Sequence, residues 1–331
     1  MLIDNWPCPC GSTKPFVSCC RRKKPVAHTL NSLANTLVIA NQQAKANATD
    51  TWNSNRQGVY DFISDTVYGL NTKEYTKVAI LGAGNCEDLP LAFLAEHAAR
   101  IDLYDVDWLA INAAKSALPG KLQKKLHCYC ADITGLYTTL IPELQTFLES
   151  GQMEEAFLLL QRFYRNPKNK FSINRKYDLV LSVNIVSQLF SVFFDLLMKT
   201  LIQMRRIENS PIVAEFMALI NNIADEIVPE QHLRILHSLT SPKGKSIITV
   251  DKFHWGSFDG IKSPITDLIS EPEDMLKQDI HQMLQAKGHH VQGSAIDTLY
   301  EKYFSLQKRD QWLWRFHDDR VFLVDGFILK P

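Results

Sequence analysis

Four of the chain's seven cysteines gather close to the N-terminus, in the stretch CPCGSTKPFVSCC at residues 8–20. They are Cys8, Cys10, Cys19 and Cys20. Zinc accepts four thiolate sulfurs in a tetrahedron and imposes no other geometry of its own. A segment this short cannot bury a hydrophobic core, so metal binding would have to supply its folding energy. The spacing therefore predicts a small zinc site.

Two other interpretations of this stretch stay open, namely a pair of disulfides and an unstructured tail. Adjacent Cys19 and Cys20 cannot pair comfortably with each other, and disulfides are rare in the reducing cytosol, where we expect this protein. The basic run at 21–24 follows at once. It either binds an anion, such as RNA or an acidic protein, or offsets the negative charge of four thiolates on zinc.

A second chemical pattern is the stretch KVAILGAGNCED at 77–88, in which an apolar run meets two glycines. Gly82 and Gly84 carry no Cβ, which permits a tight turn and a close approach of the backbone to a ligand. Dinucleotide-binding turns place a third glycine where this chain has Glu87. Because a carboxylate repels a pyrophosphate, the pattern favours a nucleoside without phosphates over NAD.

Polar residues also end the apolar runs that follow. Asp105 can accept both hydrogen bonds of a ribose diol, and Asp132 can accept the exocyclic amine of an adenine. Asn184 and Gln188 come after the next run, where either could orient a reacting substrate. Each of these residues also has a simpler interpretation as a helix cap.

The elements that must position these residues alternate along the chain. We expect strands at 77–85, 100–107, 125–133, 176–186 and 244–253, and an antiparallel hairpin at 312–329. We expect helices at 59–69, 89–98, 108–118, 141–164, 187–202 and 208–239. Alternating strands and helices indicate a doubly wound α/β sheet, in which ligands bind at the carboxyl ends of the strands.

The cysteine stretch resembles the SEC-C zinc motif. That resemblance implies zinc ligands at the four cysteines and a docking role for the module, toward a protein or a ribosome. Thr13 stands where the motif commonly has Gly, and residues 15–17 are less basic than is usual. The sequence is similar over about 55–331 to the class I S-adenosylmethionine (SAM) dependent methyltransferases. The stretch ILGAGNCEDL at 80–89, with SQL at 187–189, resembles a bacterial subgroup of these enzymes.

The methyltransferase resemblance implies a seven-stranded, mostly parallel, Rossmann-like sheet with SAM as the cofactor. Gly82 and Gly84 would line the methionine part of SAM, Asp105 would hold the ribose and Asp132 the adenine. Asp88 would hold the glycine turn or the SAM amino group. The chain departs from the family pattern at Cys86, where a third glycine is usual, and at Ile80, where an acid is usual.

The predicted organisation is a zinc motif at 1–24, a helical linker at 25–54 and a methyltransferase-like domain at 55–331. Helical insertions at about 140–175 and 200–240 either cover the substrate or thicken the helical layer.

Composition adds two expectations to this organisation. Lys and Arg (36) balance Asp and Glu (36), which predicts no membrane or nucleic-acid partner. The N-terminus lacks a secretory pattern, so we expect a cytoplasmic protein.

The leading hypothesis is a SAM-dependent methyltransferase whose acceptor, a small molecule or a macromolecule, is unknown. One alternative is a non-catalytic zinc-module adaptor with a decayed nucleoside-binding fold. The other is a nicotinamide-dependent oxidoreductase, which Glu87 disfavours.

Overall fold

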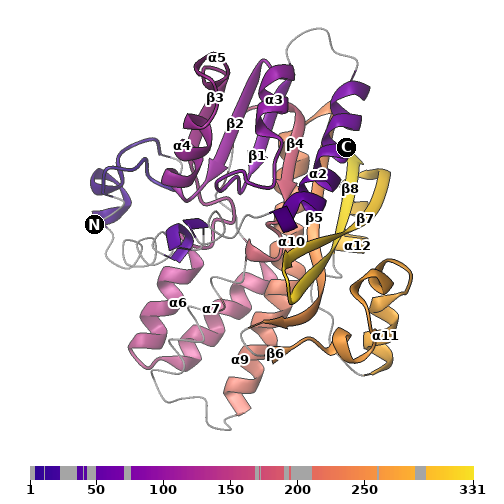
Figure 1. Ribbon diagram of the computed structural model, residues 1–331. Helices are drawn as coiled ribbons and strands as arrows, with labels where there is room; N and C mark the ends of the chain where they lie inside the picture. Colours follow the sequence, from indigo (N-terminus) through magenta and orange to yellow (C-terminus); the bar gives the residue numbers. More distant parts are fainter. Residues whose placement is uncertain are drawn as a thin grey trace.

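The computed structural model describes most of the 331-residue chain, and its strands form one sheet (Figure 1). The described residues are 4–10, 12–22, 36–39, 41–42, 50–70, 76–167, 171, 173–189, 194, 211–258, 261–287 and 296–331. The strands are β1 (Lys77–Leu81), β2 (Arg100–Asp105), β3 (Leu126–Cys130), β4 (Tyr177–Val183), β5 (Thr240–Phe258), β6 (Ile261–Lys262), β7 (Ser305–His317) and β8 (Arg320–Lys330).

The strand order is β3-β2-β1-β4-β5-β8-β7, with the short β6 paired to the end of β5. Strands β1 to β5 run parallel, whereas β8 is antiparallel to both β5 and β7. The order reverses at β1, between β2 and β4, which is the place where a ligand is expected in such a sheet. The predicted doubly wound, mostly parallel α/β fold with a C-terminal hairpin is confirmed.

Both faces of the sheet are covered, because successive side chains of a strand point to opposite sides. In β1, Val78 and Ile80 join one apolar cluster and Ala79 and Leu81 join the other. The first cluster packs under α2 (Asn53–Gly69), α3 (Leu91–His97) and α4 (Trp108–Ser116). Parallel strands buried on both faces give continuous apolar runs in the sequence, which is why they were predictable.

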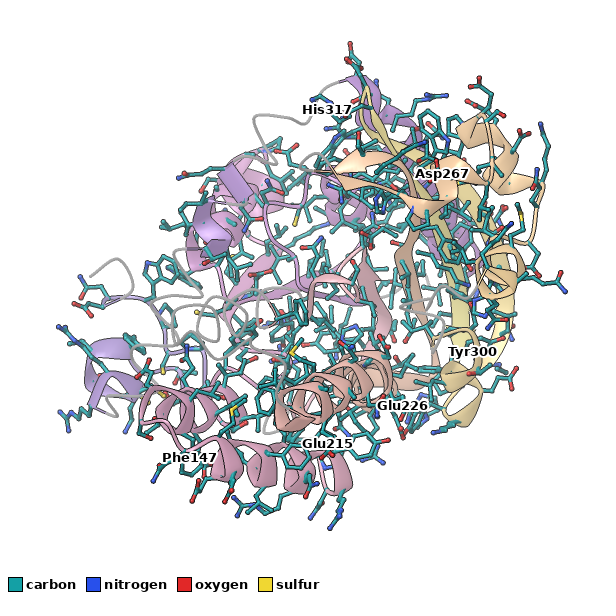
Figure 2. The ribbon with its side chains drawn as sticks, turned by 90° about the horizontal axis from the view of Figure 1, so that it is seen from below. Phe147, Glu215, Glu226, Asp267, Tyr300 and His317 are labelled. Atoms are coloured by element: carbon teal, nitrogen blue, oxygen red, sulfur yellow. The ribbon has the colours of Figure 1, made fainter. Side chains whose placement is uncertain are left out.

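The other face carries the helical insertions α6 (Leu140–Glu149), α7 (Met153–Arg165), α9 (Pro211–Asn222) and α10 (Val228–Leu239). Figure 1 shows α6, α7 and α9 together below the sheet. Seen from below, the helical segments that bear Phe147, Glu215 and Glu226 lie side by side, away from His317 at the hairpin turn (Figure 2). These insertions therefore form a helical layer of their own.

Two expectations about the helices need correction. The single helix expected at 141–164 is wrong, because the chain breaks at Gly151, whose φ of 80° is left-handed. The regular helix expected at 208–239 is interrupted by a π-helical turn (η4, Ile223–Ile227). This turn comes just before Pro229, which has no N–H to donate to a regular helix. The helix expected at 187–202 and the linker at 25–54 lie mostly outside the described residues.

The remaining described elements are short. They are η1 (Phe16–Ser18), η2 (Cys20–Arg22), η3 (Asp50–Trp52), α5 (Gly120–Gln123), η5 (Pro264–Asp267), η6 (Pro272–Leu276), α11 (Ile280–Ala286), α12 (Ile296–Leu299) and η7 (Tyr300–Lys302). Strand β5 is far longer than the expected 244–253, because it pairs with β8 as far as Gly256. Among the helices of the described segments, none combines the length and the apolar character needed to cross a bilayer.

Candidate functional site

The turn after β1 has an unusual backbone, in which three alternate residues adopt left-handed conformations. Gly82, Gly84 and Cys86 have φ angles of 62°, 48° and 57°. The turn is tied to β2, since the backbone N–H groups of Gly82 and Ala83 both donate to the Tyr104 carbonyl. Cys86 thus adopts a conformation that glycine takes more easily, at a cost of about 1–2 kcal/mol.

Gly82 is required for space as well as for conformation. A Cβ at this position would lie 2.5 Å from Cδ1 of Ile185, which follows β4. The turn after β1 and the segment after β4 are therefore in direct contact. A larger residue at position 82 would push them apart.

Asp105, at the end of β2, holds the glycine turn from the side. One carboxylate oxygen accepts the Gly84 N–H at 2.8 Å, and the other accepts the Asp107 N–H at 2.7 Å. Each oxygen keeps a second lone pair for another donor. Burial raises the pKa of Asp105 to about 6, and the backbone donors of Asp107, Gly84 and Val106 oppose that shift.

Asp88 is linked to α2 and to the C-terminal hairpin. Its carboxylate accepts a hydrogen bond from the Asn55 side-chain amide at 3.2 Å, and the Asn55 oxygen accepts one from the Trp312 indole at 2.9 Å. Burial raises the pKa of Asp88 to about 6, while the Asn55 and Asn184 side-chain amides oppose that shift. Asn55 is fully buried, and nothing in the sequence pattern singled it out.

Glu87 is also held by α2. The Arg56 guanidinium donates to the Glu87 carbonyl at 3.0 Å and lies 3.9 Å from its carboxylate. The negative charge expected at the turn is therefore present, with a cation beside it.

Asp132, beyond the end of β3, organises the loop that follows it. One carboxylate oxygen accepts hydrogen bonds from the backbone of Thr134 and Gly135 and from the Thr134 hydroxyl. The other accepts from the backbone and the hydroxyl of Thr138. This carboxylate is therefore committed to the loop, and its predicted contact with an adenine stays a prediction.

Asn184 follows β4 in a left-handed conformation, with φ 52°. Its side-chain oxygen accepts the Thr249 hydroxyl at 2.8 Å, and Gln188 donates to its backbone carbonyl at 2.9 Å. Asn184 is 2% exposed, and its side-chain nitrogen lies beside the Asp88 carboxylate, whose pKa it lowers, without a hydrogen bond of regular geometry. A buried donor without a regular hydrogen bond costs about 1–3 kcal/mol, and an acceptor on a bound molecule would recover that cost.

All of the predicted nucleoside and substrate residues line one cavity of about 330 Å³. They are Gly82, Gly84, Asp88, Asp105, Asp132, Asn184 and Gln188. This volume falls within the range of small-molecule sites. What each residue binds stays a prediction, and the structure brings these residues together around one cavity.

The cavity also has aromatic lining residues that the sequence reasoning missed, among them Trp52, Trp314 and Phe316. Their rings contact one another with centroids 5.1–5.2 Å apart. Trp314 and Phe316 are two residues apart on β7, and the period of two in a strand was the signal that could have found them.

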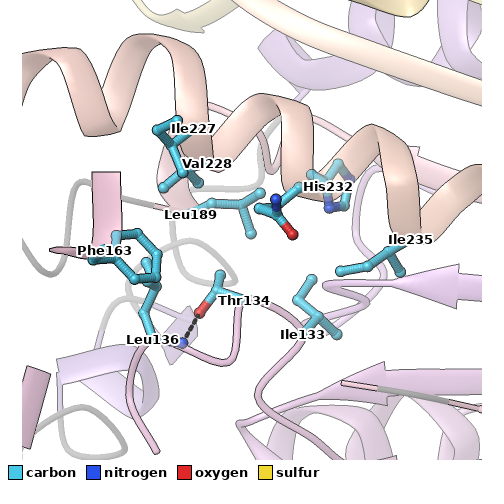
Figure 3. Close-up of a pocket in the computed structure, with 10 residues that line it drawn as sticks. Ile133, Thr134, Leu136, Phe163, Leu189, Ile227, Val228, His232 and Ile235 are labelled. Atoms are coloured by element: carbon cyan, nitrogen blue, oxygen red, sulfur yellow. Dashed lines mark hydrogen bonds between the residues drawn. The ribbon is translucent and has the colours of Figure 1, made fainter. Parts of the chain in front are cut away.

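A small apolar gap lies behind the Asp132 loop, between the loop and the insertion helices (Figure 3). Its volume of about 10 Å³ is near the lower limit for a single water. His232 lines it and bonds the Ser182 hydroxyl at 2.7 Å, and burial lowers the pKa of His232 to about 4. The insertion thus packs closely behind the cavity wall, and this part of it supports the loop.

The four N-terminal cysteines come together, with all their sulfur atoms within 4.8 Å of one another. The Cys10 and Cys19 sulfurs are 3.6 Å apart. Zinc–sulfur bonds of about 2.3 Å give a tetrahedron with edges of about 3.8 Å, so the cluster fits such an ion. A hydrogen bond from the Cys20 thiol lowers the pKa of Cys8 to about 5, which favours a thiolate.

Neither a protein-family model nor a curated protein matches the chain. Among solved structures it is similar to the N-methyltransferase NodS from Bradyrhizobium japonicum, with 11% identity, a TM-score of 0.38 and coverage of 83% of this chain and 96% of that one.

Two further similar structures give the same picture. The glycopeptide N-methyltransferase MtfA, complexed with SAM, has 9% identity and a TM-score of 0.40, with coverage of 84% of this chain and 95% of that one. A TehB-like SAM-dependent methyltransferase from Corynebacterium glutamicum has 10% identity, a TM-score of 0.36 and coverage of 89% and 98%. The fold assignment here depends on the strand order of the chain itself.

Proposed function

We propose that this chain is a SAM-dependent methyltransferase that carries a structural zinc ion on its four N-terminal cysteines. One observation carries the proposal. The glycine turn and the Asp105 carboxylate meet in one cavity at the point where the strand order reverses. Nucleoside sites in such sheets use both features, namely a glycine turn after the first strand and an acid for the ribose diol.

The residues of the turn have distinct tasks in this proposal. Gly82 and Gly84 give the turn the left-handed path that lines the space for the methionine portion of the cofactor, and Asp105 uses its remaining lone pairs for the ribose hydroxyls. Asp88 holds the glycine turn through Asn55 and offers its other oxygen to the cofactor's amino group. SAM supplies an activated methyl group when bound, so the protein's main task is to align an acceptor with it.

The acceptor side of the cavity is assigned to Asn184 and the aromatic residues. The Asn184 amide, which makes no regular hydrogen bond within the protein, donates to an acceptor atom of the substrate and so orients it. Trp52, Trp314 and Phe316 exclude water from the same space. Gln188 positions Asn184 through the hydrogen bond to its carbonyl.

Calorimetry with S-adenosylhomocysteine, the product of methyl transfer, tests the nucleoside site. We expect one binding site, with affinity at least tenfold lower in Asp105→Ala because two ribose hydrogen bonds are lost. Glu96→Gln is the matched control, since Glu96 is exposed on α3 and its side chain has no role in the cavity. Tight binding of NAD without any response to S-adenosylhomocysteine would contradict the proposal.

Methyl transfer itself is tested with labelled SAM and fractionated cell extract. The proposal predicts incorporation of label into one acceptor fraction by the unmodified chain and not by Asp105→Ala. Nucleoside binding without incorporation into any fraction would favour a non-catalytic adaptor.

A further inference from the structure

The cysteine module is joined directly to the wall of the nucleoside cavity. The backbone carbonyl of Pro9 accepts the Asp132 N–H at 2.9 Å, and Cys10 forms a β-bridge with Ala131. Pro9 lies between two of the four cysteines. The segment that would wrap a metal ion is thus the same segment that holds the end of β3.

The module is also part of the main hydrophobic core. Phe16 is fully buried, and Trp6 and Cys8 are 6% and 1% exposed. They belong to the same apolar cluster as Tyr104 and Ile133, on the sheet and its loop. A module that served only for docking would keep its apolar surface apart from the core. The burial of this module therefore indicates that it stabilises the sheet and the loop after β3.

Asp132 connects the cysteine module to a loop that lines the cavity. Its N–H is held by the module, and its carboxylate holds the backbone of Thr134, Gly135 and Thr138. The same loop supplies Ile133, Thr134 and Tyr137 to the cavity lining. A shift of the Pro9 segment would therefore move one wall of the site.

We infer that the cysteine module is a positioning element of the nucleoside cavity, so that metal occupancy and nucleoside affinity are thermodynamically coupled. Pro9 and Cys10 fix residues 131–132 only while the four sulfurs are held together. The identity of the ligand rests on the proposed function, whereas the coupling depends only on the contacts between the module and the loop. Coupling is reciprocal, so a bound nucleoside must in turn retain the metal.

The first experiment measures affinity and metal retention on the full chain. S-adenosylhomocysteine binding is measured by calorimetry with zinc bound and after chelation, and we expect at least a tenfold loss of affinity without zinc. Reciprocally, S-adenosylhomocysteine should slow the transfer of zinc to a chelator. Equal affinity in the two states would overturn the coupling.

Amide hydrogen exchange tests the coupling without any nucleoside. Chelation should raise the exchange rates of the amides of Asp132, Gly135 and Thr138, whereas those of β1, in the sheet interior, should not change. If S-adenosylhomocysteine binds neither the zinc-bound nor the chelated protein, the proposed function fails. Hydrogen exchange alone then tests whether metal in the module holds the loop at 131–138 in place. Unchanged exchange across 131–138 would refute the coupling.

Variants separate positioning from folding of the module. Pro9→Gly leaves all four cysteines but frees the backbone that bears the carbonyl, so we expect full zinc content and several-fold weaker S-adenosylhomocysteine binding. Pro15→Gly is the matched control, because Pro15 is exposed and its bridge partner is Pro7, within the module. Equal loss of affinity in both variants would mean a general loosening and would contradict a specific role for Pro9.

Discussion

The Asn55 side chain links the segment after the glycine turn to the C-terminal hairpin, because its amide donates to Asp88 while its oxygen accepts the Trp312 indole N–H. Asn55 lies on α2, Asp88 follows the glycine turn, and Trp312 lies on β7. A buried side chain with donor and acceptor both used specifies one relative position for all three elements. This contact fixes the turn from outside the sheet.

Asn55→Ala should therefore lower the free energy of unfolding by about 1–3 kcal/mol, because it leaves the Trp312 N–H and one Asp88 oxygen without their partner. Denaturant unfolding measures the change. Asn53→Ala, at the exposed start of the same helix, removes only an exposed hydrogen bond from Arg56 and should stay within about 0.5 kcal/mol of the parent protein. Equal effects of the two substitutions would contradict the bridging role.

Gly82→Ala should be more damaging than an ordinary glycine substitution. The new Cβ would meet Ile185 at 2.5 Å in a left-handed backbone, and we expect a loss of about 2–4 kcal/mol in unfolding free energy together with weaker S-adenosylhomocysteine binding. Gly120→Ala is the control, since nothing lies within 4 Å of the new Cβ. Gly120 begins α5, so that substitution should be neutral or slightly stabilising.

Nucleoside binding should depend on pH through Asp105 and Asp88. Burial raises the pKa of each to about 6, so both are largely protonated at pH 5 and ionised at pH 7.5. Because a carboxylate accepts more hydrogen bonds than a carboxylic acid, S-adenosylhomocysteine affinity should rise about tenfold from pH 5 to pH 7.5. Calorimetry across this range measures it, and Asp105→Asn should flatten part of the rise.

Stability of the ligand-free protein should change in the opposite direction. A folded-state pKa near 6, above the unfolded value near 3.9, gives a stabilising contribution that is complete below about pH 4 and lost as pH rises through 6. The unfolding free energy of the parent protein should therefore fall, relative to that of Asp105→Asn, as pH rises from 4 to 7. A constant difference from pH 4 to pH 7 would mean that Asp105 has an ordinary pKa.

Zinc content should be about one equivalent per chain by elemental analysis, and Cys8→Ser/Cys10→Ser should lose it, because two of the four sulfurs that lie together are removed. Cys128→Ser is the matched control, since Cys128 lies on β3 and its thiol donates to the Ile111 carbonyl. Metal loss should also lower the unfolding free energy, because binding to the folded state alone stabilises it. Metal-free protein with an intact module would refute the zinc assignment.

The sequence predicted the sheet because its central strands are buried on both faces and appear as short apolar runs. It also placed the candidate binding residues at the carboxyl ends of the strands, which parallel strands bring to one edge. Gly82 and Asp105 were identifiable from this rule alone. The helix break at Gly151 was missed because a single glycine is compatible with a helix, and only the left-handed backbone shows that it ends one.

Three features of the site depend on contacts that no local pattern records. Cys86 occupies a glycine-like conformation, although its residue type gives no sign of it. Asp132 was placed correctly at the cavity, but its five hydrogen bonds to the following loop depend on the path of that loop. The bridge from Cys10 to Ala131 joins segments far apart in the chain, and residue spacing alone cannot predict such a contact.

Two substitutions at Asn184 separate the effect of its left-handed backbone from the effect of its side-chain amide. Asn184→Gly and Asn184→Ala both remove the amide and its hydrogen bond to Thr249, but only glycine relieves the left-handed conformation. We expect Asn184→Gly to be more stable than Asn184→Ala by about 1 kcal/mol in denaturant unfolding. Both variants should lose methyl transfer to the same degree while binding S-adenosylhomocysteine within about threefold of the parent protein. Since the two differ in strain and share the missing amide, parent-like turnover in Asn184→Gly would show that the amide does not orient the acceptor.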